Sequence, residues 1–94
     1  NYLGEGGFRA LVASPHLGGL RVLKLGRNQI PDAAVARTRD ALPGFLGRLR
    51  LLDLSGNRLT RVGIDGLRIA QGDRPVILEL SGNVQATAGG ETPV

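Results

Sequence analysis

The chain has 94 residues, and it contains no cysteine and only one histidine, His16. Without cysteine it can form no disulfide and no thiolate metal site, and it has no cysteine nucleophile. A single histidine also leaves a His-based catalytic triad or a multi-histidine metal site without partners. The phosphate-binding patterns G-x-x-x-x-G-K-[ST] and G-x-G-x-x-G are absent from the sequence. We therefore expect a protein that is not an enzyme and that carries no metal and no other cofactor.

Aromatic residues and long apolar runs are scarce as well. Tyr2, Phe8 and Phe45 are the only aromatic residues, too few for a platform on which nucleic acid bases could stack. No apolar run approaches the roughly 20 residues that a membrane-spanning helix needs. The sequence therefore predicts no membrane association and argues against a nucleic acid partner, and we expect a cytoplasmic protein.

The charge is unbalanced, because 12 basic residues outnumber 8 acidic ones and give a net charge of +4. All the basic residues except Lys24 are arginines, and they are spread along the chain rather than gathered in one run. A basic chain raises the question of a nucleic acid or an acidic partner. Arg21 and Arg50 hold equivalent positions just before two expected strands, and Arg48, two residues before Arg50, adds to them.

The pattern that is present is a repeat rich in leucine. The segments LRVLKLGRNQI (20–30), LRLLDLSGNRL (49–59) and PVILELSGNVQ (75–85) follow L-x-x-L-x-L-x-x-N-x-L, with departures at Pro75 and Gln85. The asparagines stand 27, 29 and 26 residues apart along the chain, at Asn1, Asn28, Asn57 and Asn83. An internal period of this length is typical of a solenoid.

Each x-L-x-L core is typical of a short strand, in which residues two apart point to the same side. The leucines expected to face the core are Leu23, Leu25, Leu52, Leu54, Leu78 and Leu80. Each asparagine stands where the chain turns away from its strand, and a carboxamide can both donate and accept hydrogen bonds. We therefore predict a structural ladder that satisfies the backbone groups left unpaired at the bends, formed by Asn28, Asn57 and Asn83.

The segments between the strands have helical character. The first, GEGGFRALVAS (4–14), spaces its apolar residues for one helix face. The second, DAAVARTRDAL (32–42), predicts a helix with Asp32 as its N-cap and Pro43 as its stop. The third, GIDGLRIAQ (63–71), predicts a shorter and weaker helix. A strand, a turn and a crossover helix per repeat predict an α/β fold with a parallel sheet on one side and helices on the other.

These features resemble the leucine-rich repeat family, and specifically its ribonuclease-inhibitor-like class, which has a helix in every repeat. In that class a glycine stands six residues after the asparagine and a leucine ten residues after it. The first and third helical segments keep both residues, whereas the second holds Ala34 and Thr38, which predicts a less regular middle helix. The pre-strand segments SPHLGGL (14–20) and PGFLGRL (43–49) also align with each other. They look like repeats of large bacterial multidomain proteins.

The resemblance implies a leucine-rich repeat solenoid, a right-handed β-α superhelix with short parallel strands on its concave face and helices on its convex face. It covers residues 1–84, and the tail over 85–94 is polar and rich in glycine, which predicts disorder. The expected units are a partial repeat over 1–19 and repeats over 20–48, 49–74 and 75–84.

The strand positions that point away from the core form rows across the expected sheet, and these rows are the candidate binding surface. One row is apolar and contains Val22, Leu51 and Ile77. The next row is charged and contains Lys24, Asp53 and Glu79. Two arginines in the bends, Arg27 and Arg58, are expected at the rim. An exposed apolar row beside a charged one suits a protein partner, although such apolar residues also simply favour strands.

We therefore expect non-catalytic protein–protein recognition through the concave strand face. A structural alternative is a C-terminal cap of a longer array, packed against the remaining repeats of the parent chain, because Pro75 and Gln85 depart from the pattern. Two further alternatives have weaker support. An arginine in a bend could stimulate a GTPase, and the basic charge could bind nucleic acid.

Overall fold

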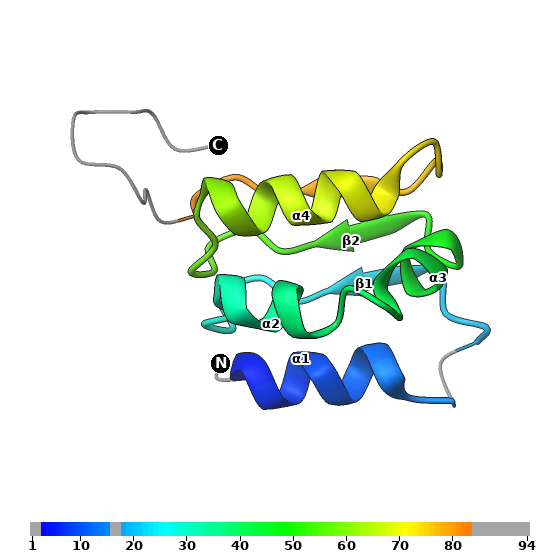
Figure 1. The fold of residues 1–94 in the computed structure, drawn as a ribbon, viewed down its shortest axis with the longest axis horizontal. Helices are drawn as coiled ribbons and strands as arrows, with labels where there is room; N and C mark the ends of the chain where they lie inside the picture. Colours follow the sequence, from blue (N-terminus) through cyan, green and yellow to red (C-terminus); the bar gives the residue numbers. More distant parts are fainter. Residues whose placement is uncertain (1–2, 16–17, 84–94) are drawn as a thin grey trace.

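The computed structural model describes residues 3–15 and 18–83. In this part of the chain the elements follow one another as α1 (Gly4–Ala13), β1 (Val22–Lys24), α2 (Asp32–Arg37), α3 (Leu42–Gly47), β2 (Leu51–Asp53), α4 (Arg61–Gln71) and β3 (Ile77–Glu79). The strands form one parallel sheet in the order β1–β2–β3 (Figure 1). The predicted α/β fold, with three parallel strands alternating with helices, is therefore confirmed. The predicted tail over 85–94, the copy beginning at Asn1 and the single His16 lie outside the described residues.

The strand register sets equivalent positions of the three leucine-rich segments side by side. Leu52 of β2 lies between Leu23 of β1 and Leu78 of β3. Leu52 is fully buried, whereas Leu23 and Leu78 pack against the core but are only partly buried. The difference follows from the strand order, because β1 and β3 are edge strands and β2 has a neighbour on each side.

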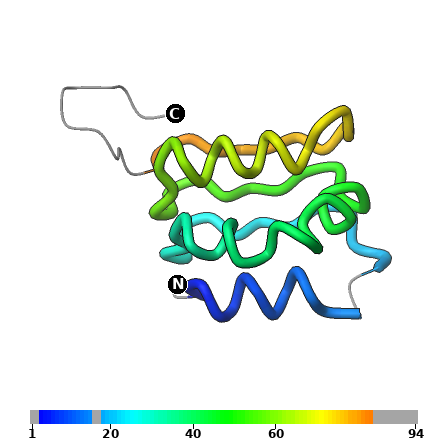
Figure 2. Tube along the Cα trace, viewed as in Figure 1, coloured from blue at the N-terminus to red at the C-terminus, as the bar shows by residue number. Residues whose placement is uncertain are grey.

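The helices cover one face of the sheet, and the core lies between these two layers (Figures 1 and 2). The helix α2 packs against α1 and α4, and α3 packs against α4. Phe8 of α1 and Phe45 of α3 are both buried and meet edge to face, with their ring centroids 6.5 Å apart. The chain passes from strand to helix at the left edge of Figure 2 and from helix to strand at the right edge.

The bend after each strand is held by a buried asparagine side chain. Oδ1 of Asn57 accepts hydrogen bonds from the backbone N–H groups of Asn28 (2.9 Å) and Ile30 (3.0 Å). Its Nδ2 donates to the carbonyls of Leu25 and Leu54, both at 2.9 Å. One carboxamide thus satisfies backbone groups of two successive bends, which no regular strand pairing would reach.

The other two asparagines have the same role at the neighbouring bends. Asn83 accepts from the backbone N–H of Leu59 (3.0 Å) and donates to the carbonyl of Leu54 (3.0 Å). Asn28 accepts from the backbone N–H of Leu3 (3.2 Å). In every case Oδ1 reaches backward to the preceding bend. Among the described residues, no buried side-chain nitrogen or oxygen lacks a hydrogen-bond partner.

The helix α4 corrects two predictions. It begins at Arg61 rather than at residue 63, and its 11 residues make it the longest helix of the described part rather than a weak one. The N-cap prediction for Asp32 is also wrong, because Asp32 is the first residue of α2 and its carboxylate caps α4 instead. It accepts hydrogen bonds from the backbone N–H groups of Thr60 (2.8 Å) and Gly63 (3.0 Å) and from the Thr60 hydroxyl. A carboxylate at a helix N-terminus also interacts favourably with the helix dipole.

Only residues 32–37 of the helix predicted over 32–42 form a continuous helix, α2, and α3 begins at the last residue of that range, Leu42. The backbone leaves the helical conformation at Thr38, which has φ of −108° and ψ of 7° and whose buried hydroxyl donates to the carbonyls of Ala34 and Val35. This agrees with the predicted irregularity of the middle helix. Pro43 does not stop a helix: it lies in the first turn of α3, where the missing N–H of a proline costs nothing.

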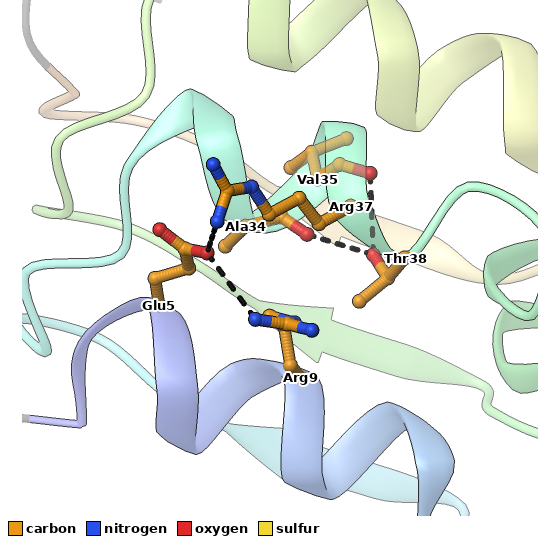
Figure 3. Close-up of polar contacts among 6 residues, drawn as sticks. All are labelled: Glu5, Arg9, Ala34, Val35, Arg37 and Thr38. Atoms are coloured by element: carbon orange, nitrogen blue, oxygen red, sulfur yellow. Dashed lines mark hydrogen bonds and ion pairs between the residues drawn. The ribbon is translucent and has the colours of Figure 1, made fainter.

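A small ion-pair cluster joins α1 to α2 on the outer face of the helix layer (Figure 3). Oε2 of Glu5 lies 2.9 Å from Nη1 of Arg37 and 3.6 Å from Nη1 of Arg9. Both arginine side chains are more than half exposed, so each pair contributes at most about 1 kcal/mol. The buried apolar side chains, rather than these ion pairs, hold the two helices together.

Candidate functional site

The candidate site is the face of the sheet that the helices leave uncovered. Val22, Leu51 and Ile77 stand in register across it as one apolar row. Val22 is 48% exposed and Ile77 is 58% exposed, while Leu51 between them is partly buried. Strands of three residues offer few such positions, so this row is the main apolar feature of the open face.

The charged row lies beside the apolar one. Lys24, Asp53 and Glu79 pair in register, so the central aspartate has a cation on one side and an acid on the other. Oδ1 of Asp53 accepts hydrogen bonds from the Ser55 hydroxyl (2.6 Å) and the Ser55 backbone N–H (2.9 Å). These two bonds, with a smaller contribution from Lys24, lower the pKa of Asp53 below its ordinary value of 3.8 against the opposing effect of burial. The row therefore presents the hydrogen-bonded carboxylate of Asp53 between an exposed cation, Lys24, and an exposed anion, Glu79.

The bend that follows the rows is tightly packed. A Cβ atom at Gly26 would lie 3.2 Å from Oγ of Ser55, the same hydroxyl that holds Asp53. Arg27 has φ of 57°, in the left-handed region that favours glycine, and the equivalent bends carry Gly56 and Gly82 with positive φ. The left-handed conformation is therefore less favourable for Arg27 than for Gly56 and Gly82. Its side chain is exposed at the rim of the open face.

The structure does not bring Arg58 to the same rim. Arg58 follows Asn57 in the chain, its backbone N–H donates to the carbonyl of Ile30 (3.0 Å), and it forms a parallel bridge with Pro31. It is exposed on the part of the bend that leads toward α4. Of the eight residues predicted to contact a partner, six therefore form the two rows, and Arg27 and Arg58 lie in the bends at different positions of the repeat.

Sequence reasoning missed an apolar feature on the helix side. Val62 and Ile69 of α4 are 72% and 81% exposed, and they flank a groove of about 510 Å³ between α2 and α4. At the base of the groove α2 and α4 approach each other closely, since a Cβ atom at Gly66 would lie 3.0 Å from Val35. The spacing of seven residues between Val62 and Ile69 could have revealed this feature, because it places both on one side of a helix.

The chain was compared with known proteins in three ways. It matches no family model, and neither a curated protein nor a solved structure shows significant similarity to it. In the described residues no helix has the length and apolar character required to cross a membrane.

Proposed function

We propose that this chain is a segment of a leucine-rich repeat solenoid that binds a protein partner through its concave strand face, without catalysis. The main support is the row formed by Val22, Leu51 and Ile77, which leaves apolar side chains in water on a face otherwise free of neighbours. A soluble protein gains nothing from such a row when it is alone, whereas a partner that covers it removes apolar area from water.

The charged row defines what the partner would offer. Asp53 stays ionised at neutral pH, and the exposed carboxylate of Glu79 lies next to it in register. A partner with an apolar segment and a nearby basic side chain would fit both rows, with the base placed over Asp53 and Glu79. Such charges mainly govern specificity and association rate rather than affinity.

The experiment is a quantitative pull-down from the cells that make the protein, with a matched pair of variants. The test variant carries Val22→Thr and Ile77→Thr, which keep the β-branched shape that strands favour while making the row polar. The control carries Val62→Thr and Ile69→Thr on α4, where two apolar residues that are even more exposed lie on the helix side of the molecule. Both variants are first shown to be folded by circular dichroism.

We expect a partner that the wild type and the α4 control retain equally and that the strand variant loses at least tenfold, since about 1 kcal/mol per buried apolar group adds up across two sites. A second variant with Lys24→Glu and Glu79→Lys keeps the net charge of +4 and tests the charged row alone. If the strand variant retained every partner, the concave-face proposal would fail. The structural alternative, a segment that only packs against further repeats, would then be favoured.

A further inference from the structure

The connections that lead from helix to strand meet at one edge of the molecule, at the right of Figure 1. Among the described residues, a hollow of about 410 Å³ lies at this edge and is lined by Arg21, Arg48 and Arg50 together with Gly47. Arg21 and Arg50 come directly before β1 and β2, so the parallel pairing of the strands brings them together: the backbone N–H of Arg50 donates to the carbonyl of Arg21 at 2.6 Å. We call this hollow the arginine pocket.

One guanidinium of the pocket is fixed in place by the backbone. Nη1 of Arg21 donates to the carbonyls of Gly18 and Leu20, both at 3.4 Å, and of Arg48 at 3.3 Å. All three contacts use the same nitrogen, while a guanidinium has five N–H donors. The remaining donors of Arg21 are therefore held in position without a described protein acceptor.

A fourth arginine, Arg74, lies beside Gly47 of the pocket lining. A Cβ atom at Gly47 would be in ordinary van der Waals contact with Nε of Arg74, at 3.5 Å, so the Arg74 side chain runs next to the pocket. Nη1 of Arg74 donates to the carbonyls of Ala70 (3.3 Å) and Gln71 (3.4 Å) at the end of α4. Arg74, like Arg21, is anchored through one nitrogen and keeps other donors available.

The charge of the pocket is of one sign. Among the described residues no acidic side chain lines it, although four of the chain's 12 basic residues gather in it or at its wall. Guanidinium groups hold oxyanions through paired N–H donors, and several of them together suit a doubly charged phosphate monoester better than a single carboxylate. Nucleic acid is disfavoured, because Phe8 and Phe45 are buried and offer no surface for base stacking.

We propose that the arginine pocket binds a phosphate monoester group, presented by a phosphorylated side chain of another protein. This site is distinct from the open face of the sheet, and it does not depend on the concave-face proposal. The pocket opens at the amino ends of the strands, so a bound phosphorylated segment would lie next to the connections before β1 and β2 rather than across α4.

The test uses a peptide library with a fixed phosphoserine and degenerate flanking positions, together with the same library carrying serine or glutamate. Binding is followed by NMR shifts of the backbone amides of Gly47 and Arg50 and by titration of the dissociation constant. The test variant carries Arg48→Gln and Arg50→Gln, whose side chains make no described hydrogen bond that the fold would lose. The control carries Arg39→Gln and Arg68→Gln, which remove the same charge elsewhere.

We expect the phosphoserine library alone to bind, the Arg48/Arg50 variant to weaken binding at least tenfold, and the Arg39/Arg68 control to change it less than twofold. Equal binding of free O-phosphoserine would support the same pocket and assign the ligand to small phosphomonoesters. Equal weakening by both variants would reduce the effect to net charge and overturn the proposal. Tighter binding of a single-stranded oligonucleotide at the same amides, or equal binding of the glutamate library, would overturn it as well.

Discussion

At the scale of single residues, the side chain of Ser55 has two structural tasks. Its hydroxyl holds the carboxylate of Asp53, and it lies against the backbone of Gly26 in the neighbouring bend. A hydrogen bond to a carboxylate favours the ionised form, and this is the largest reason why the pKa of Asp53 is lowered. The pH at which the carboxylate of Asp53 loses its charge therefore depends on a residue outside the two rows.

Replacing Ser55 by alanine should raise the pKa of Asp53 toward its ordinary value of 3.8. Because the wild-type pKa is depressed in the folded state, its stabilising contribution is fully present above about pH 3.8 and is lost as the pH falls through the folded-state pKa. The difference in unfolding free energy between wild type and Ser55→Ala should thus be larger at pH 7 than at pH 2. We expect less than about 1 kcal/mol, because Asp53 is partly exposed.

Carboxyl NMR titration and urea unfolding at the two pH values measure these effects. The control is Ser81→Ala, at the equivalent position after β3, which should leave the titration of Asp53 unchanged. A pKa of Asp53 that stayed fully depressed in Ser55→Ala would show that the backbone N–H of residue 55 and Lys24, rather than the serine hydroxyl, govern the carboxylate.

At the scale of elements, α4 depends on a side chain that another helix supplies. Asp32 of α2 accepts the backbone N–H groups of Thr60 and Gly63, and its carboxylate leaves no room for a side chain at Gly63. A Cβ atom there would lie 2.1 Å from Oδ1 of Asp32. The glycine and the aspartate therefore act together in capping α4, although 31 residues separate them in the sequence.

Gly63→Ala should destabilise the protein by about 2 kcal/mol, because the new methyl group expels the carboxylate that caps α4. Gly6→Ala in α1 is the matched control, since nothing lies within 4 Å of its Cβ position and alanine favours a helix. That variant should gain about 0.5–1 kcal/mol. Chemical unfolding measures both, and a double-mutant cycle with Asp32→Ala should show that the effects of Asp32→Ala and Gly63→Ala do not add. Additive effects would show that Asp32 and Gly63 contribute to stability independently.

The elements also show which part of the fold could be predicted from the sequence. The strands could be predicted because the L-x-L pattern that defines each one lies within three consecutive residues. The start of α4 was missed although it carries a local signal: the Thr60 hydroxyl caps the helix by accepting from the backbone N–H of Val62 (3.2 Å). The second cap, supplied by Asp32 from 28 residues away, could not be predicted from the local pattern. Pro43 was misread because a proline can follow the end of one helix or stand in the first turn of the next, and α2 has already ended at Arg37 when Pro43 enters the first turn of α3.

At the scale of the whole molecule, the sheet has one inner strand and two outer ones. Leu23, Leu52 and Leu78 occupy the same register position, but only Leu52 has a strand on both sides and is fully buried. The chemistry of the three residues is identical, so any difference in their contribution to stability measures position in the sheet.

Leu52→Ala should cost about 3–4 kcal/mol, within the range for fully buried leucines, because a neighbouring strand on each side limits the collapse of the cavity. Leu23→Ala and Leu78→Ala should each cost about 1–2 kcal/mol, since water already reaches part of those side chains. Urea unfolding of the three single variants measures the order. Equal losses in all three would mean that the outer strands are covered as completely as the inner one.

The candidate surfaces were predictable to different degrees at this scale. The rows on the open face follow from the alternation within strands and the spacing between them, so all six row residues stand where the pattern predicts, in register. The arginine pocket does not follow from any pattern. Arg74 comes from a connection that breaks the repeat spacing, and the conformation of Arg21 depends on carbonyls that only the folded connections bring together.

The asparagine ladder makes each bend depend on the segment that follows it in the chain. Oδ1 of Asn57 completes the bend at Asn28 and Ile30, and Oδ1 of Asn83 completes the bend at Leu59. Each of these bends therefore depends on the asparagine of the following segment, and a chain cut before Asn83 would leave the N–H of Leu59 without this acceptor.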